Sequence, residues 1–149
     1  MATQEIRASK QIQAAPEKIY AMIADYHNGH PHILPKPYFV ALEVEKGGYG
    51  AGTVIRFQMK LMGRLQKFRA EITEPEPGRV LVETDLDTGT TTTFTVEEHA
   101  QAQESLVSIR TVTQVRDGLF GAVEGWLTVR LLQSIYTKEL DQLASVAEK

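Results

Sequence analysis

The sequence predicts an α+β fold in which a long C-terminal helix lies across a curved, seven-stranded antiparallel sheet, with two short helices after the first strand. Short segments with the two-residue periodicity of β-strands follow one another from residue 40 to residue 115. Only a few residues link them, which suits an antiparallel meander, because parallel strands need long crossovers. The segment 119–147 then has a helical period and contains no proline.

The first strand and the short helices are expected within residues 6–38. The segment 6–12 is predicted as a strand, and Pro16 stands where proline favours the first turn of a helix ending near Asp25. One side of this helix is apolar, formed by Ile19, Tyr20, Met22 and Ile23. The segment 26–38 contains three prolines, which predicts a loop or a broken second helix.

Six further strands are expected, in the segments 40–46, 53–61, 65–73, 79–86, 90–98 and 105–115. The clearest alternation occurs in the segment 53–61, where one face carries Ile55, Phe57, Met59 and Leu61. Glycine- or proline-containing turns separate the first five of these strands, at residues 47–48, 62–63, 75–78 and 87–89. Each strand is therefore expected to pair with the next one along the chain.

The long helix carries two apolar stripes. The first contains Phe120, Val123, Leu127, Leu131 and Ile135, and the second contains Leu132, Tyr136, Leu140, Leu143 and Ala147. Gly121 and Gly125 lie in its first half, where each costs about 1 kcal/mol relative to alanine. Two interpretations stay open: the first half bends over a cavity while the second packs on solid core, or the helix has one wide buried face that tolerates the glycines.

Composition restricts the possible functions. The chain has 149 residues, enough for one domain, and a net charge of −3, which gives no electrostatic basis for binding nucleic acid. It has no cysteine, which excludes disulfides, thiolate catalysis and cysteine metal sites. Residues 1–12 lack the apolar core of a signal peptide, and no window approaches the roughly 18 apolar residues of a membrane span. We expect a cytoplasmic protein with no integral membrane segment.

Four motifs resemble those of a known family: the helix start at 14–20, Asp25-Tyr26 with Pro35, the strand 52–56, and the turn 74–81. Together they identify the chain as similar to the polyketide cyclase/dehydrase group of the START-like (SRPBCC) superfamily, although the usual tryptophan of the second motif is absent. The resemblance implies one helix-grip domain over residues 1–149, with a hollow between sheet and helix. The superfamily includes lipid carriers, hormone receptors, quinone-binding proteins, aromatic cyclases and oxygenase subunits, so the fold alone does not select a function.

Strand alternation predicts which side chains line this hollow. The candidate ligand-binding residues are Tyr26, Phe57, Met59, Phe68, Thr84, Thr92, Phe94, Ile109, Thr111, Thr113, Phe120, Val123, Glu124 and Leu127. Ala70 and Val82 are expected on the same concave face. An apolar lining with a few hydroxyls suits a hydrophobic ligand that carries one or two polar groups. The alternatives are a filled core, or threonines on ordinary exposed strand faces, since threonine favours strands. A register error of one residue would also exchange the two faces.

Glu124 and the histidine-rich loop are the candidate polar groups. Glu124 lies beside the cavity-facing stripe, where it would be an acid, a base or simply a solvated rim residue. His27, His30 and His32 suggest a metal, but their spacing is not that of a structural zinc site, so no metal is predicted. This loop is instead expected to border the pocket mouth, and the glycine-rich segment 47–52 to be a flexible hairpin loop or a lid. No cofactor motif is present.

Three functions remain open at this point. The leading one is binding or transport of a small lipid-like, quinone or aromatic ligand. The second is a cyclase or dehydratase acting on an aromatic or polyketide substrate, with Glu124, Tyr26, His27 and Arg56 as the first candidates. The third is a protein-interaction module that uses an exposed strand face with Arg56, Gln58, Lys60, Lys67 and Arg69.

Overall fold

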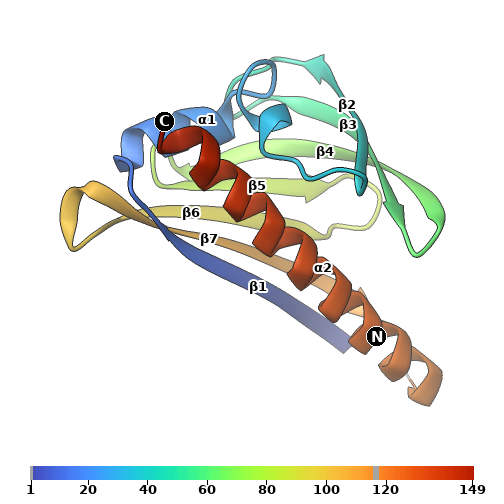
Figure 1. Ribbon diagram of the computed structural model, residues 1–149. Helices are drawn as coiled ribbons and strands as arrows, with labels where there is room; N and C mark the ends of the chain where they lie inside the picture. Colours follow the sequence, from blue (N-terminus) through green and yellow to red (C-terminus); the bar gives the residue numbers. More distant parts are fainter. Residues whose placement is uncertain (1, 116–117) are drawn as a thin grey trace.

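A computed structural model describes the backbone of residues 2–115 and 118–149, and the side chains in these ranges except at positions 2, 102, 115, 119 and 120. It consists of a curved sheet with a long helix laid across its concave side (Figure 1). The elements are β1 (Ala2–Ile12), α1 (Pro16–Ala24), η1 (His30–His32), β2 (Phe39–Lys46), β3 (Val54–Leu61), β4 (Arg64–Glu76), β5 (Val80–Asp85), β6 (Thr91–His99), β7 (Gln101–Val115) and α2 (Gly118–Ala147).

The sheet has seven strands in the order β1-β7-β6-β5-β4-β3-β2, and every neighbouring pair is antiparallel. The predicted α+β helix-grip fold is therefore confirmed, including the meander from β2 to β7 and the two short helices after β1. All of β1 pairs with β7, from Ala2 opposite Val115 to Ile12 opposite Ser105. The last strand of the meander thus returns beside the first strand of the chain.

The prediction of which β5 residues face the concave side of the sheet was wrong by one residue. Glu83 is opposite Ile72 on β4 and Thr92 on β6, both of which face inward, so the inner face carries Leu81, Glu83 and Asp85. Thr84 and Val82 therefore belong to the outer face. β4 includes the first two residues of the predicted turn, 75 and 76, and its register shifts between Thr73 and Glu76. Such an irregularity is how a strand accommodates a proline, and it changes which residues oppose one another.

The second stripe of α2 is buried as predicted: Tyr136, Leu140, Leu143 and Ala147 all lie in the core, and Leu132 packs against it. The first stripe was wrong at Val123 and Leu127, which are 52% and 43% exposed. The side chain of Phe120 lies outside the described residues. Gly121 and Gly125 are buried instead, and the Gly125 carbonyl accepts a 2.8 Å hydrogen bond from Gln4 Nε2 on β1.

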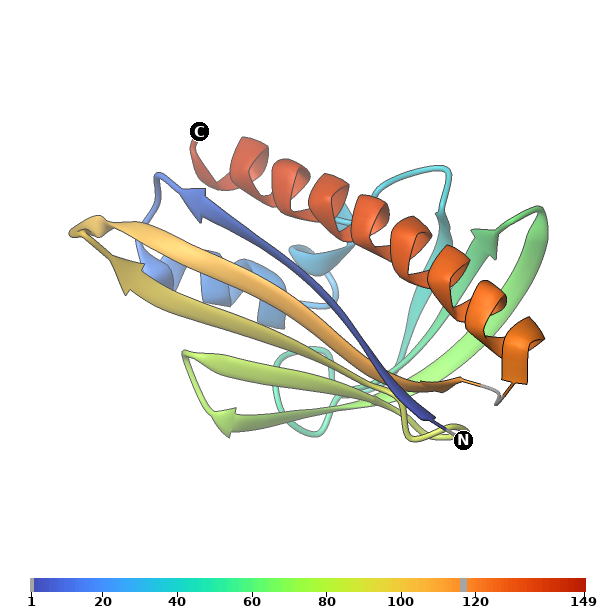
Figure 2. The same cartoon turned by 90° about the horizontal axis from the view of Figure 1, so that it is seen from below.

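The core and the hollow occupy opposite ends of the sheet. Figure 2 shows the second half of α2 beside α1, and the first half extending over the far end of the sheet near the β3–β4 hairpin. The solid core beneath the second half includes Ile19 and Ile23 of α1 together with Ile135 of α2, each at 0% exposure. Close packing at one end therefore fixes the helix, while its first half spans a cavity.

Candidate ligand cavity

A cavity of about 670 Å³ lies between α2 and the concave face of the sheet. Its walls come from β2 to β7, η1 and α2. The mouth is formed by the β3–β4 hairpin around Met62, the β5–β6 turn at Thr88 and the first half of α2 at Glu124, all of which are exposed. The closed end is formed by η1 and by the second half of α2. The volume falls within the usual range of small-molecule sites.

One wall of the cavity is aromatic. Phe57 on β3 is directly opposite Phe68 on β4, and their rings stack with centroids 4.9 Å apart. Phe39 on β2 continues this wall at 6.3 Å from Phe57. Aliphatic side chains complete the apolar surface: Leu34, Leu42, Ile55, Met59, Leu61, Leu131 and Leu132.

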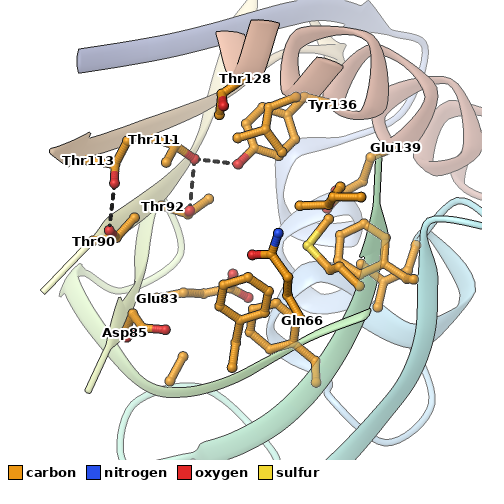
Figure 3. Close-up of a pocket in the computed structure, with 18 of the residues that line it drawn as sticks. Gln66, Glu83, Asp85, Thr90, Thr92, Thr111, Thr113, Thr128, Tyr136 and Glu139 are labelled. Atoms are coloured by element: carbon orange, nitrogen blue, oxygen red, sulfur yellow. Dashed lines mark hydrogen bonds between the residues drawn. The ribbon is translucent and has the colours of Figure 1, made fainter. Parts of the chain in front are cut away.

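The opposite wall carries a ladder of hydroxyls. Thr92 and Thr111 are opposite each other on β6 and β7, with their hydroxyl oxygens 2.8 Å apart, and Thr111 also contacts the Tyr136 hydroxyl at 2.6 Å (Figure 3). Thr113 pairs with Thr90 at 2.8 Å. These threonines therefore face inward and satisfy one another, as polar groups in a buried wall require. Burial raises the pKa of Tyr136 to about 12.

The closed end holds a polar cluster around Glu83. The Tyr26 hydroxyl donates a 2.6 Å hydrogen bond to Glu83 Oε2, and the Tyr26 ring stacks on His30 with centroids 4.4 Å apart. His30 Nδ1 lies 2.8 Å from the Ile23 carbonyl oxygen, which only accepts, so Nδ1 carries a proton. His30 Nε2 then faces Glu83 Oε2 at 3.6 Å. Burial, followed by the negative charge of Glu83, raises the pKa of Tyr26 well above its ordinary value.

Glu139 reaches this end of the cavity from α2. It is only 3% exposed, and within the described part of the chain it forms no hydrogen bond or ion pair. Burial, with the nearby negative charge of Glu83, raises the pKa of Glu139 well above the usual range of a carboxyl. Figure 3 shows Glu83 and Glu139 entering the cavity from the sheet and from the helix.

Sequence reasoning missed both carboxyls. Glu83 was missed because the register of β5 was assigned one residue out. Glu139 was missed although a signal existed: it is three residues after Tyr136 and one before Leu140, within the stripe predicted to be buried. A charged residue in such a stripe is rarely buried without a partner, and so marks a candidate site.

The structure brings together some of the predicted site residues and separates others. The cavity is lined by Phe57, Met59, Phe68, Thr92, Phe94, Thr111, Thr113 and Glu124. Thr84 lies on the outer face of the sheet, and Val123 and Leu127 face solvent, so these predictions are corrected. Ile109 packs in the core at 1% exposure, and Tyr26 lies behind Glu83. Phe120 lies outside the described residues.

Expectations for the two loops also change. Of the three loop histidines only His30 is buried, and it lies at the closed end, so the loop does not border the mouth. In the described part of the chain, no group of three or more histidine or acidic side chains is arranged to hold a metal ion. The segment 47–52 is not a lid, because its backbone is tied to the end of α1: Tyr26 N donates to the Gly48 carbonyl at 2.9 Å, and Gly50 N donates to the Ala24 carbonyl at 3.0 Å.

A curved antiparallel sheet wrapped around a long helix, with a cavity between them, is the helix-grip fold. The chain belongs to the polyketide cyclase / dehydrase and lipid transport family, whose sequence profile matches residues 3–148. No curated protein matches the sequence significantly.

Solved structures show the same fold. The KanY protein is 24% identical, with a TM-score of 0.86 and 100% of both chains covered. The Zhui aromatase/cyclase from Streptomyces sp. R1128 is 14% identical, with a TM-score of 0.79 over 99% of this chain and 94% of that one. A START superfamily protein from Mycobacterium smegmatis is 12% identical, with a TM-score of 0.72 and 97% of each chain covered. At these identities the likeness establishes the fold alone.

Among the described residues, no helix combines the length and the apolar character needed to cross a membrane.

Proposed function

We propose that this protein binds or carries a small, largely apolar molecule in the cavity between α2 and the sheet. The observation that carries the proposal is the cavity itself, about 670 Å³ with an aromatic wall. Protein interiors are close-packed, and voids larger than a water molecule are few. The cavity is large, is open at one end, and has hydroxyls that already satisfy one another. These features are typical of a ligand-binding site rather than of a packing defect in the core.

The first test is binding of the neutral fluorescent probe N-phenyl-1-naphthylamine to the wild type and to a variant with a smaller cavity. Ala70 lines the cavity and is 3% exposed, so Ala70→Leu adds three carbons to the space that the probe needs. Ala122→Leu adds the same atoms at an exposed position on α2 and is the matched control. We expect Ala70→Leu to weaken probe binding by about tenfold and Ala122→Leu to leave it unchanged.

Native mass spectrometry of freshly purified protein complements this test. A stoichiometric excess mass that disappears on denaturation gives the chemical class of a resident ligand. Absence of probe binding to the wild type, or equal binding by the two leucine variants, contradicts the proposed cavity.

A second candidate function is catalysis of proton transfer on a bound carbonyl compound. One of the structures with the same fold is an aromatase/cyclase, which is consistent with such an activity. The observation that favours it is Glu139, whose raised pKa suits a general acid. The test follows deuterium exchange at the carbon next to the carbonyl of a neutral aryl ketone. Exchange above the buffer rate that is lost in Glu139→Gln supports this candidate, and exchange at the buffer rate removes it.

A further inference from the structure

We propose that the closed end of the cavity binds the protonated amine of a ligand whose remaining body is apolar or aromatic. This inference rests on the proposed function, because it names the polar group of the molecule that the same cavity takes. It is carried by the hydrogen-bonding character of the closed end, by Glu139, and by the charges of the lining.

The polar atoms around Glu83 offer acceptors to a ligand. The single hydroxyl proton of Tyr26 is already donated to Glu83 Oε2, and the Nδ1 proton of His30 is donated to the Ile23 carbonyl. The atoms left to face a guest include the oxygens of the Glu83 carboxylate, which accept hydrogen bonds. An ammonium group has three donors and no acceptor, which complements this set.

Glu139 is a buried polar side chain that lacks a partner among the described residues. Burial and the charge of Glu83 favour the protonated form of Glu139 when no cation lies beside it. A cation placed between Glu83 and Glu139 favours the ionised form of Glu139 instead, because an opposite charge within about 4–6 Å lowers the pKa of a carboxyl group. Binding of an ammonium group is therefore expected to release the proton that Glu139 holds.

The lining as a whole is acidic. Among the residues that the structure describes, the lining contains the carboxyl groups of Glu83, Asp85, Glu124 and Glu139, and one guanidinium, that of Arg64, which is exposed at the mouth. Other polar groups of the lining are His30 and the Tyr136 hydroxyl at the closed end, and the amide of Gln66, which is exposed on β4. This distribution attracts a cation and repels the carboxylate of a fatty acid. The stacked Phe57 and Phe68 add ring faces, which also favour cations.

The test compares three ligands with one apolar body: 4-phenylbutylamine, 4-phenylbutanol and 4-phenylbutyrate. Isothermal titration calorimetry at pH 7 measures each dissociation constant for the wild type. We expect the amine to bind at least about tenfold more tightly than the alcohol, and the butyrate to bind most weakly. In Glu139→Gln the preference for the amine falls below about threefold while the affinity for the alcohol is kept. Glu43→Gln, an exposed site on β2, keeps the wild-type preference.

Proton release is a second readout, and the wild type alone supplies it. Titrations in two buffers with different ionisation enthalpies give the number of protons released on binding. We expect the amine to release a proton from the wild type and the alcohol to release none. Equal affinity for amine and alcohol, or amine binding without proton release, overturns the inference but leaves the proposed function standing. If the neutral probe and all three compounds fail to bind, the proposed function is overturned as well.

Discussion

Thr111 on β7 and Tyr136 on α2 are joined by a hydrogen bond of 2.6 Å between their hydroxyl groups, which ties the long helix to the sheet beside the cavity. Thr111 also contacts Thr92 at 2.8 Å, so one threonine links two strands and the helix. Thr111 and Tyr136 are buried, at 3% and 8% exposure. This hydrogen bond is therefore expected to stabilise the fold, and its two residues also form part of the cavity wall.

The first prediction concerns this link. Thr111→Val leaves the Tyr136 hydroxyl without its 2.6 Å partner, which is expected to cost about 1–3 kcal/mol of unfolding free energy. Tyr136→Phe removes the other hydroxyl. A double-mutant cycle measured by urea denaturation should give a coupling energy of about 1 kcal/mol. Additive effects of the two substitutions would show that the hydroxyls do not interact in solution.

The second prediction concerns pH. Below the ordinary carboxyl pKa, Glu139 is protonated in both the folded and the unfolded chain. Above it the unfolded chain loses this proton while the folded protein keeps it, because the folded pKa is raised. The free energy of unfolding therefore falls as pH rises from the ordinary carboxyl pKa towards the raised folded value. Glu139→Gln should match the wild type near pH 4 and be more stable than the wild type at pH 8.

Denaturant titrations of both proteins across this pH range provide the measurement, with Glu43→Gln as the control at an exposed site. A difference between Glu139→Gln and the wild type that stays constant with pH would contradict the raised pKa.

The third prediction concerns the anchored segment 47–52. Gly50 has a φ of +63°, and a Cβ there would lie 2.3 Å from Glu74 Oε1. Glu74 accepts hydrogen bonds from the Tyr20 hydroxyl at 2.6 Å and from Ala51 N at 2.7 Å, so Gly50→Ala displaces a carboxylate with two partners. Gly89→Ala also takes a positive φ, +78°, but nothing lies within 4 Å of its Cβ.

We expect Gly89→Ala to lose about 1 kcal/mol of unfolding free energy through backbone strain, and Gly50→Ala to lose about 1–2 kcal/mol more. Thermal or chemical denaturation measures both variants. Equal losses would mean that the Glu74 carboxylate moves aside without cost.

The fourth prediction separates the two faces of α2. Leu131 lines the cavity, whereas Leu127 is 43% exposed. Leu131→Ser is therefore expected to weaken binding of N-phenyl-1-naphthylamine severalfold, because it places a hydroxyl in the apolar wall. Leu127→Ser should leave the affinity unchanged. The opposite order would mean that α2 is rotated relative to the described structure.

The sequence by itself determined the architecture. Periodicity of two from residue 40 to residue 115 and the short links between strands required an antiparallel meander, and the proline-free segment 119–147 required a long helix. The buried stripe through Tyr136, Leu140 and Leu143 was also readable, because helical spacing is a local property. In the segment 53–61, alternation correctly placed Phe57 and Met59 on the inner face.

Only the tertiary structure decided the chemistry of the site. The register shift between Thr73 and Glu76 turns Glu83 rather than Thr84 inward, and alternation within β5 alone does not fix which set of residues faces the core. The two stripes of α2 look alike in sequence, but the second is buried or half-buried along its length, whereas the first begins in solvent at Val123 and Leu127 and is buried only towards Ile135. Glu83 and Glu139 lie on different elements, so their shared position at the closed end follows from how the helix crosses the sheet.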